Sequence, residues 1–183
     1  MNFDSIVNDY LEVAQNLYGP MKNDWNYFGL EFNDMGPHLR YFTNTGNLVI
    51  SLSEKARNDN VQFHVQLSHE ICHMLYPTMD KETHENPPAS VLNEGVSTYF
   101  SFMAIENLCN VQDVISNIEQ YSNNYYQAFL LVAKLHKIDR EAIKKLRTIQ
   151  PMLNKLTEAD FEASGLQVPK ELVVQLLKEF EPA

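Results

Sequence analysis

The spacing of hydrophobic residues changes along this chain of 183 residues. From Phe3 to Leu17 apolar residues recur every three to four positions, which predicts an amphipathic helix that stops at Gly19-Pro20. Residues 25–52 are instead rich in aromatic and β-branched residues and contain turn sequences, which favours about three short strands with a hairpin at residues 44–46. The first third of the chain therefore predicts a covering helix and a small sheet.

The remaining two thirds of the chain predict helices. Turn residues ending in Asp59-Asn60 precede a helical pattern that runs to about Tyr76, where Pro77 stops it. A second long helix follows Pro87-Pro88 and continues to about Leu108. Further helices are predicted over residues 111–119, 124–136, 139–149 and 169–180, with a capping-box variant at Thr157 and Asp160. The expected fold class is α+β, with a small mixed sheet followed by a mostly helical part.

Composition is that of an ordinary globular protein, with 44% hydrophobic and 21% charged residues. The formal net charge of −10 argues against nucleic acid or an anionic membrane surface as a partner. No leader pattern and no run long enough for a membrane span is visible, so we expect a cytoplasmic protein without membrane association, monomeric by default. The two cysteines, Cys72 and Cys109, are expected to be small core residues.

The most informative pattern is H-E-x-x-H at residues 69–73, inside an apolar run. His69 and His73 are i and i+4, so both imidazoles project from one face of a helix, one turn apart. Zinc accepts imidazole nitrogen, and a catalytic site uses three protein ligands and leaves one position open. Glu70 lies about 100° around the helix, where it can reach water without binding the metal, as a general base does. The alternative is a buried helix whose histidines make ordinary hydrogen bonds.

A third ligand is predicted at Glu94, a lone carboxylate in a long apolar segment. Burying an unpaired carboxylate costs several kcal/mol, and a divalent cation would offset that cost. Gly95 would permit close approach of a neighbouring helix. Ser97, Thr98 and Asn93 are assigned a supporting role, in which they hydrogen-bond the ligand and hold its orientation. The alternative for Glu94 is a helix-start glutamate favoured by the helix dipole.

These motifs resemble those of the gluzincin metallopeptidases, particularly the aminopeptidase N group. Twenty residues separate the second histidine from the glutamate of Asn93-Glu94-Gly95, and the segment from Tyr125 is similar to a helix of that group beginning Y-x-x-G. The resemblance covers about half the chain, residues 46–137. It implies a zincin-like fold, one Zn²⁺ ion held by the two histidines and Glu94, Glu70 as the base, and Tyr125 as hydrogen-bond donor to the oxyanion.

The position of the oxyanion tyrosine is ambiguous from the sequence. Tyr126 is adjacent to Tyr125, Tyr121 is a third possibility, and Ala128 stands where that group has glycine. Tyr125 also shares one face of its predicted helix with apolar residues, so plain packing is the alternative.

The strand predicted at residues 47–53 directly precedes the helix with the two histidines. In zincin-like folds an edge strand beside the site pairs with an extended substrate backbone. That role is assigned here to Leu48, Ile50 and Leu52, and an internal strand is the alternative. His64 is predicted to lie off the ligand face. His84 falls in a polar connection, where it is either a solvated loop residue or a contact for substrate.

The sequence as a whole predicts a zinc-dependent peptide-bond hydrolase whose partner is a peptide or protein substrate. Residues 1–183 are expected to form a single domain, with a helix and sheet over 1–60, the helices of the metal site over 61–110 and a helical subdomain over 111–183. One alternative is a catalytically inactive or regulatory zinc-binding relative that acts through protein binding. Another is a helical interaction domain in which the motif is accidental.

Overall fold

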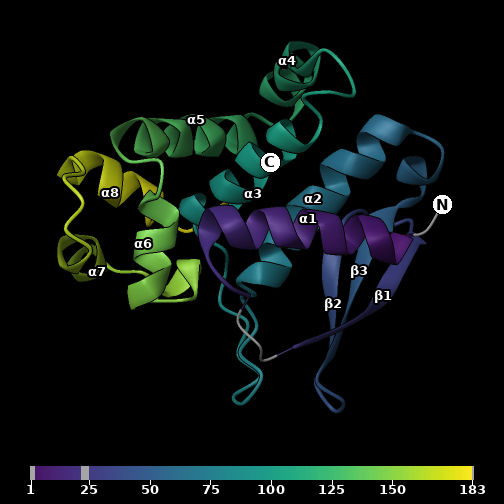
Figure 1. Ribbon diagram of the computed structural model, residues 1–183, viewed down its shortest axis with the longest axis horizontal. Coiled ribbons are helices and arrows are strands. Elements are labelled where there is room, and N and C mark those ends of the chain that lie inside the picture. The colour runs from purple at the N-terminus through teal and green to yellow at the C-terminus, as the bar shows by residue number, and fades with distance from the viewer. Residues whose placement is uncertain (1–2, 22–24, 183) are drawn as a thin grey trace.

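A computed structural model describes residues 3–21 and 25–182 and has an α+β architecture, as predicted (Figure 1). The strands lie at one side of the molecule, α1 runs across the middle, and the C-terminal helices lie at the other side. The helices and strands are α1 (Phe3–Tyr18), β1 (Asn26–Asn33), β2 (His38–Phe42), β3 (Asn47–Ser53), α2 (Asn60–Leu75), α3 (Val91–Ala104), α4 (Val111–Tyr121), α5 (Asn123–Ile138), α6 (Ala142–Ile149), α7 (Glu158–Ala163) and α8 (Lys170–Leu176). Within the described ranges, no helix combines the length and the apolar character that crossing a bilayer requires.

The sheet has the strand order β1-β3-β2, with β1 parallel and β2 antiparallel to β3. The predicted hairpin therefore joins β2 to β3, but β3 is the central strand and not an edge strand. Leu48, Ile50 and Leu52 have no exposed surface. Because both sides of β3 are already paired, these residues cannot bind an extended substrate backbone, which corrects the expectation. The edge strand on the side of the two histidines is β2, and α2 packs against both β2 and β3.

The two long helices of the predicted metal site begin where the sequence indicates. The Asp59 carboxylate accepts hydrogen bonds from the main-chain N–H groups of Val61 and Gln62, both at 3.0 Å, and caps α2. Ser90 caps α3 through the main-chain N–H of Asn93 at 3.2 Å. Toward the C-terminus α3 and α8 each end about four residues earlier than predicted, at Ala104 and Leu176. Thr157 and Asp160 form the predicted capping box of α7.

A buried cation joins the ends of three helices. The Arg147 guanidinium of α6 donates hydrogen bonds to the main-chain carbonyls of Tyr18, Gly19, Pro20 and Leu75, at 2.7 to 3.0 Å. The last carbonyls of a helix have no partner within it, so this one side chain satisfies groups at the ends of both α1 and α2. The position of α2 is thereby tied to a residue that lies more than seventy positions later in the chain.

Candidate metal centre

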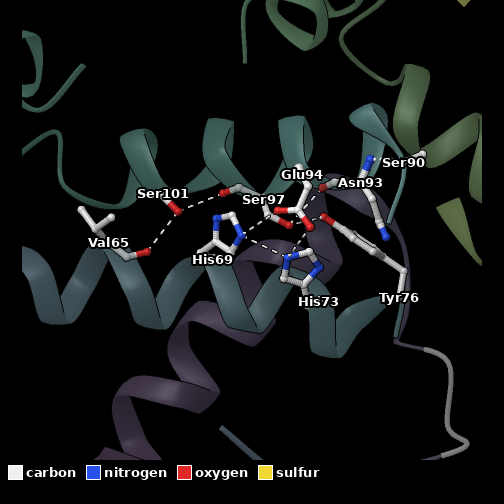
Figure 2. Close-up of polar contacts among 9 residues, drawn as sticks. All are labelled: Val65, His69, His73, Tyr76, Ser90, Asn93, Glu94, Ser97 and Ser101. Atoms are coloured by element: carbon white, nitrogen blue, oxygen red, sulfur yellow. Dashed lines mark hydrogen bonds and ion pairs between the residues drawn. The ribbon is translucent and has the colours of Figure 1, made fainter. Parts of the chain in front are cut away.

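Three side chains from α2 and α3 meet at one point (Figure 2). The Nε2 atoms of His69 and His73 lie 3.0 Å apart. Glu94 places Oε2 3.1 Å from Nε2 of His69 and Oε1 3.4 Å from Nε2 of His73. These three residues could hold a metal ion.

The spacing and chemistry of the three donors fit a small divalent cation. Ligand distances of about 2.0–2.2 Å in tetrahedral geometry put donor atoms about 3.3–3.6 Å apart. The observed separations of 3.0 to 3.4 Å are close to this. Two imidazoles and one carboxylate also make a three-donor set that leaves a fourth position.

The electrostatics of the centre favour a cation as well. Burial by itself would raise the pKa of Glu94, but His73 and the hydrogen bonds from both histidines outweigh it and hold that pKa well below its usual value. Burial likewise opposes protonation of His73, while the Glu94 and Glu70 carboxylates raise its pKa to about 9. Neither described cavity that adjoins the centre is lined by a lysine or an arginine. Two buried carboxylates therefore face the histidines without a permanent positive charge.

Glu70 lies beside the three donors and not among them. Only 3% of the surface of this residue is exposed. Burial raises the pKa of the carboxyl group, with His73 and His69 acting in the opposite direction. Among the described residues none donates a hydrogen bond to this carboxylate. Glu70 lines both cavities next to the centre, so it is placed to exchange a proton with a small molecule there.

No protein-family model, curated protein or solved structure matches this chain.

Of the three candidate tyrosines, the structure brings Tyr125 to the centre. Its ring lies 5.9 Å from the ring of His69, and it lines both adjoining cavities. Burial, followed by the charges of Glu94 and Glu70, raises the pKa of Tyr125 to about 12, so its hydroxyl keeps its proton at neutral pH. Tyr126 contacts neither cavity and has its ring near Phe129, and Tyr121 is 72% exposed.

The predicted supporting residues of Glu94 do not contact its carboxylate. Ser97 donates to the main-chain carbonyl of Asn93 at 3.1 Å and lies 3.2 Å from the Tyr76 hydroxyl (Figure 2). The side-chain amide of Asn93 and the hydroxyl of Thr98 are buried without a hydrogen-bond partner in the described part of the chain. This corrects the expectation: the short Ser97 hydroxyl reaches the backbone of its own helix, whereas the longer Glu94 side chain extends across to α2.

His64, His84 and the two cysteines lie away from the centre. His64 lies off the ligand face, as predicted, with Nδ1 2.6 Å from the Tyr10 hydroxyl. His84 is an exposed loop residue that lines neither adjoining cavity. Cys72 and Cys109 are free thiols, and burial raises the pKa of Cys72 to about 12, which makes it unreactive.

The structure adds residues that no sequence motif marks. His38 of β2 lines the polar cavity beside the centre, together with Thr78 and Asn86 of the connection between α2 and α3. The Nδ1 atom of His38 lies 2.9 Å from the carbonyl of Gly36 and must donate to it, because a carbonyl only accepts. The sequence does not mark His38 as a site residue, because its position beside the cavity depends on the strand order, which only the structure gives.

The C-terminal segment also reaches the centre. The Phe180 ring lies 4.7 Å from the Tyr125 ring, and its main-chain N–H donates to the carbonyl of Ala89 at 2.8 Å. The Asn124 amide donates to the carbonyl of Glu181 at 2.7 Å. These contacts tie the start of α3, which carries Glu94, to the start of α5, which carries Tyr125.

Gly95 sets the distance between α3 and α5, as the sequence predicts. A Cβ atom at this position would lie 2.5 Å from the carbonyl oxygen of Ala128 and 2.6 Å from Cγ2 of Val132. Both distances are shorter than van der Waals contact, and one is to backbone. Because Gly95 has no side chain, α5 can approach α3 closely enough to bring Tyr125 beside the metal centre.

We expect Gly95→Ala to destabilise the fold by about 1–3 kcal/mol, because the added methyl group overpacks a contact with backbone. Helix propensity alone predicts the opposite sign, a gain of about 1 kcal/mol. Urea unfolding of the variant and the wild type measures the difference. Stability equal to or above that of the wild type would show that the two helices are not held at the distance described.

Proposed function

We propose that the protein is a zinc-dependent peptidase of the gluzincin type that cleaves peptide or protein substrates. The observation that carries this proposal is the convergence of His69, His73 and Glu94 at 3.0 to 3.4 Å beside the buried, unbonded Glu70 carboxylate. A zincin-like arrangement is consistent with a helix that carries two histidines, lies against a small mixed sheet and receives its third donor from the next helix.

In this proposal each side chain has a separate task. The two histidines and Glu94 would hold the ion, and bound zinc would polarise the scissile carbonyl and lower the pKa of water to about 7. Glu70 accepts the proton of the attacking water and delivers it to the leaving amine, and a carboxyl pKa raised by burial suits the delivery. Tyr125 donates a hydrogen bond to the developing oxyanion, which is typically worth about 2.7–4 kcal/mol.

In this proposal the substrate backbone lies along the edge strand β2, because β3 is the central strand. The β2 strand pairs with β3 on one side only, and His38, Leu39 and Tyr41 line the cavity beside the centre. The open edge of β2 offers main-chain groups to an extended peptide, which would bind with little demand on its sequence.

We expect the wild-type protein to contain one zinc ion per chain, and His73→Ala and Glu94→Ala to lose it, because each removes one of three donors. Elemental analysis after dialysis against a weak chelator measures the content. His84→Ala is the matched control, since His84 is an exposed loop residue, and should keep its zinc. Wild-type protein without stoichiometric metal, or Glu94→Ala that retains it, would contradict the assignment.

Glu70→Gln should keep its zinc and lose turnover by about 10²–10⁴-fold, because the amide cannot accept the water proton. Cleavage of a peptide library, followed by mass spectrometry, gives the rate. Glu82→Gln, in the exposed connection, is the control and should cleave as the wild type does. Full activity of Glu70→Gln would refute its role as base. Zinc binding by a wild type that cleaves no peptide would favour the regulatory zinc-binding protein instead.

Tyr125→Phe should lower kcat by about 10²–10³-fold with little change in zinc content, because only the hydroxyl is lost. Tyr126→Phe removes the same group one position away, outside both cavities, and should leave kcat unchanged. Steady-state kinetics on one cleaved peptide compares the two. An unchanged kcat in Tyr125→Phe would leave this residue a purely structural role.

A further inference from the structure

After α8 the chain returns to the starts of α3 and α5 and pairs with the residues that precede α3 (Figure 1). The main-chain N–H of Val91 donates to the carbonyl of Lys178 at 2.9 Å, and the N–H of Phe180 donates to the carbonyl of Ala89 at 2.8 Å. The residues between these two bonds form an antiparallel bridge. Residues 178–181, the C-terminal segment, are therefore joined by main-chain bonds to the start of the helix that carries the third donor.

The same segment holds the start of α5. The side chain of Ser122, which precedes this helix, makes no capping hydrogen bond. The Asn124 amide of the first turn instead donates to the carbonyl of Glu181 at 2.7 Å. Phe180 is only 8% exposed, and the centre of its ring lies 4.7 Å from that of the Tyr125 ring. Four consecutive residues thus contact both α3 and α5 where these helices approach the metal centre.

Packing, and not hydrogen bonding, holds the Tyr125 side chain. Its hydroxyl bonds to no other residue in the described part of the chain. Its ring lies beside two other rings, that of His69 at 5.9 Å and that of Phe180 at 4.7 Å between ring centres. Because His69 is a candidate metal ligand, Phe180 is the aromatic neighbour that has no other task at the centre. The place of the Tyr125 hydroxyl therefore depends on how firmly Phe180 is held.

We propose that Phe180 is a positioning residue for Tyr125, and that the pairing of residues 178–181 with residues 89–91 fixes its ring where it keeps the tyrosine beside the metal centre. For its effect on cleavage, this inference rests on the proposed peptidase function. The placement of the Tyr125 ring can be measured separately, without a substrate.

Phe180→Ala should lower kcat by about 10–10²-fold with little change in KM or zinc content, because displacement of a group by about 1 Å can cost this much. In a Tyr125→Phe background the same substitution should change kcat by less than about 2-fold, because the hydroxyl that Phe180 positions is already absent. Phe180→Tyr keeps the ring and should retain the wild-type kcat, since Phe180 also lines a cavity of about 510 Å³ with room for a hydroxyl.

Two further variants separate positioning from a general loss of stability. Phe161→Ala removes a phenylalanine of α7 that is 3% exposed and lines neither cavity beside the centre. It should lower the free energy of unfolding and leave kcat unchanged. Phe180→Leu keeps an apolar side chain in the fold and takes the place of Phe180→Ala if that variant does not fold. It too should lower kcat only where the Tyr125 hydroxyl is present.

The outcomes separate this inference from the peptidase proposal. A wild-type kcat in Phe180→Ala and Phe180→Leu, or a loss of kcat that is equally large in the Tyr125→Phe background, would overturn the positioning role and leave the peptidase standing. If the wild type cleaves no peptide, the peptidase proposal fails, and nuclear Overhauser contacts between the rings of Tyr125 and His69 decide the question by NMR. Contacts that the Phe180 variants weaken and Phe161→Ala preserves would support the positioning role. Contacts that respond equally to both changes, or to neither, would overturn it.

Discussion

A carboxylate buried between two imidazole rings is the constraint on which the rest of this structure depends. An ionised glutamate that is 8% exposed is tolerated only when its charge is compensated, and removal of one partner of such a group is costly. Here the partners are one turn apart on α2, so α2 and α3 have to keep one separation and one rotation relative to each other. Ser101 supports this by donating across the interface toward the main-chain carbonyl of Val65 at 3.1 Å (Figure 2).

Two consecutive residues of α3 orient three helices. Successive positions on a helix point about 100° apart, so Glu94 faces α2 while Gly95 faces α5. The first determines where the donor atoms meet, and the second determines how close Tyr125 comes to them. The outer parts of the chain then hold these helices in place, through the buried Arg147 at the end of α2 and the Phe180 contact with Tyr125.

The centre lies between two cavities of unlike character, and this bears on what it can act upon. One is walled by apolar side chains of α2 and α4, and the other by polar side chains of β2 and the connection before α3. The two cavities have Pro37, His69, Glu70 and Tyr125 in common, so they adjoin at the centre. A molecule that spans the centre would therefore contact both linings.

The sequence by itself determined the helices and the chemistry that one helix can present. The spacing of His69 and His73, the caps Asp59 and Ser90 and the missing side chain at Gly95 act within a turn or at one position, so their consequences follow from the regular geometry of a helix. Only the tertiary structure decided which strand lies at the edge, which tyrosine reaches the centre, and which partners the Ser97 hydroxyl has. Alternating apolar residues specify the face of a strand but not its neighbours, and the contacts of His38 and Phe180 join segments that only packing brings together.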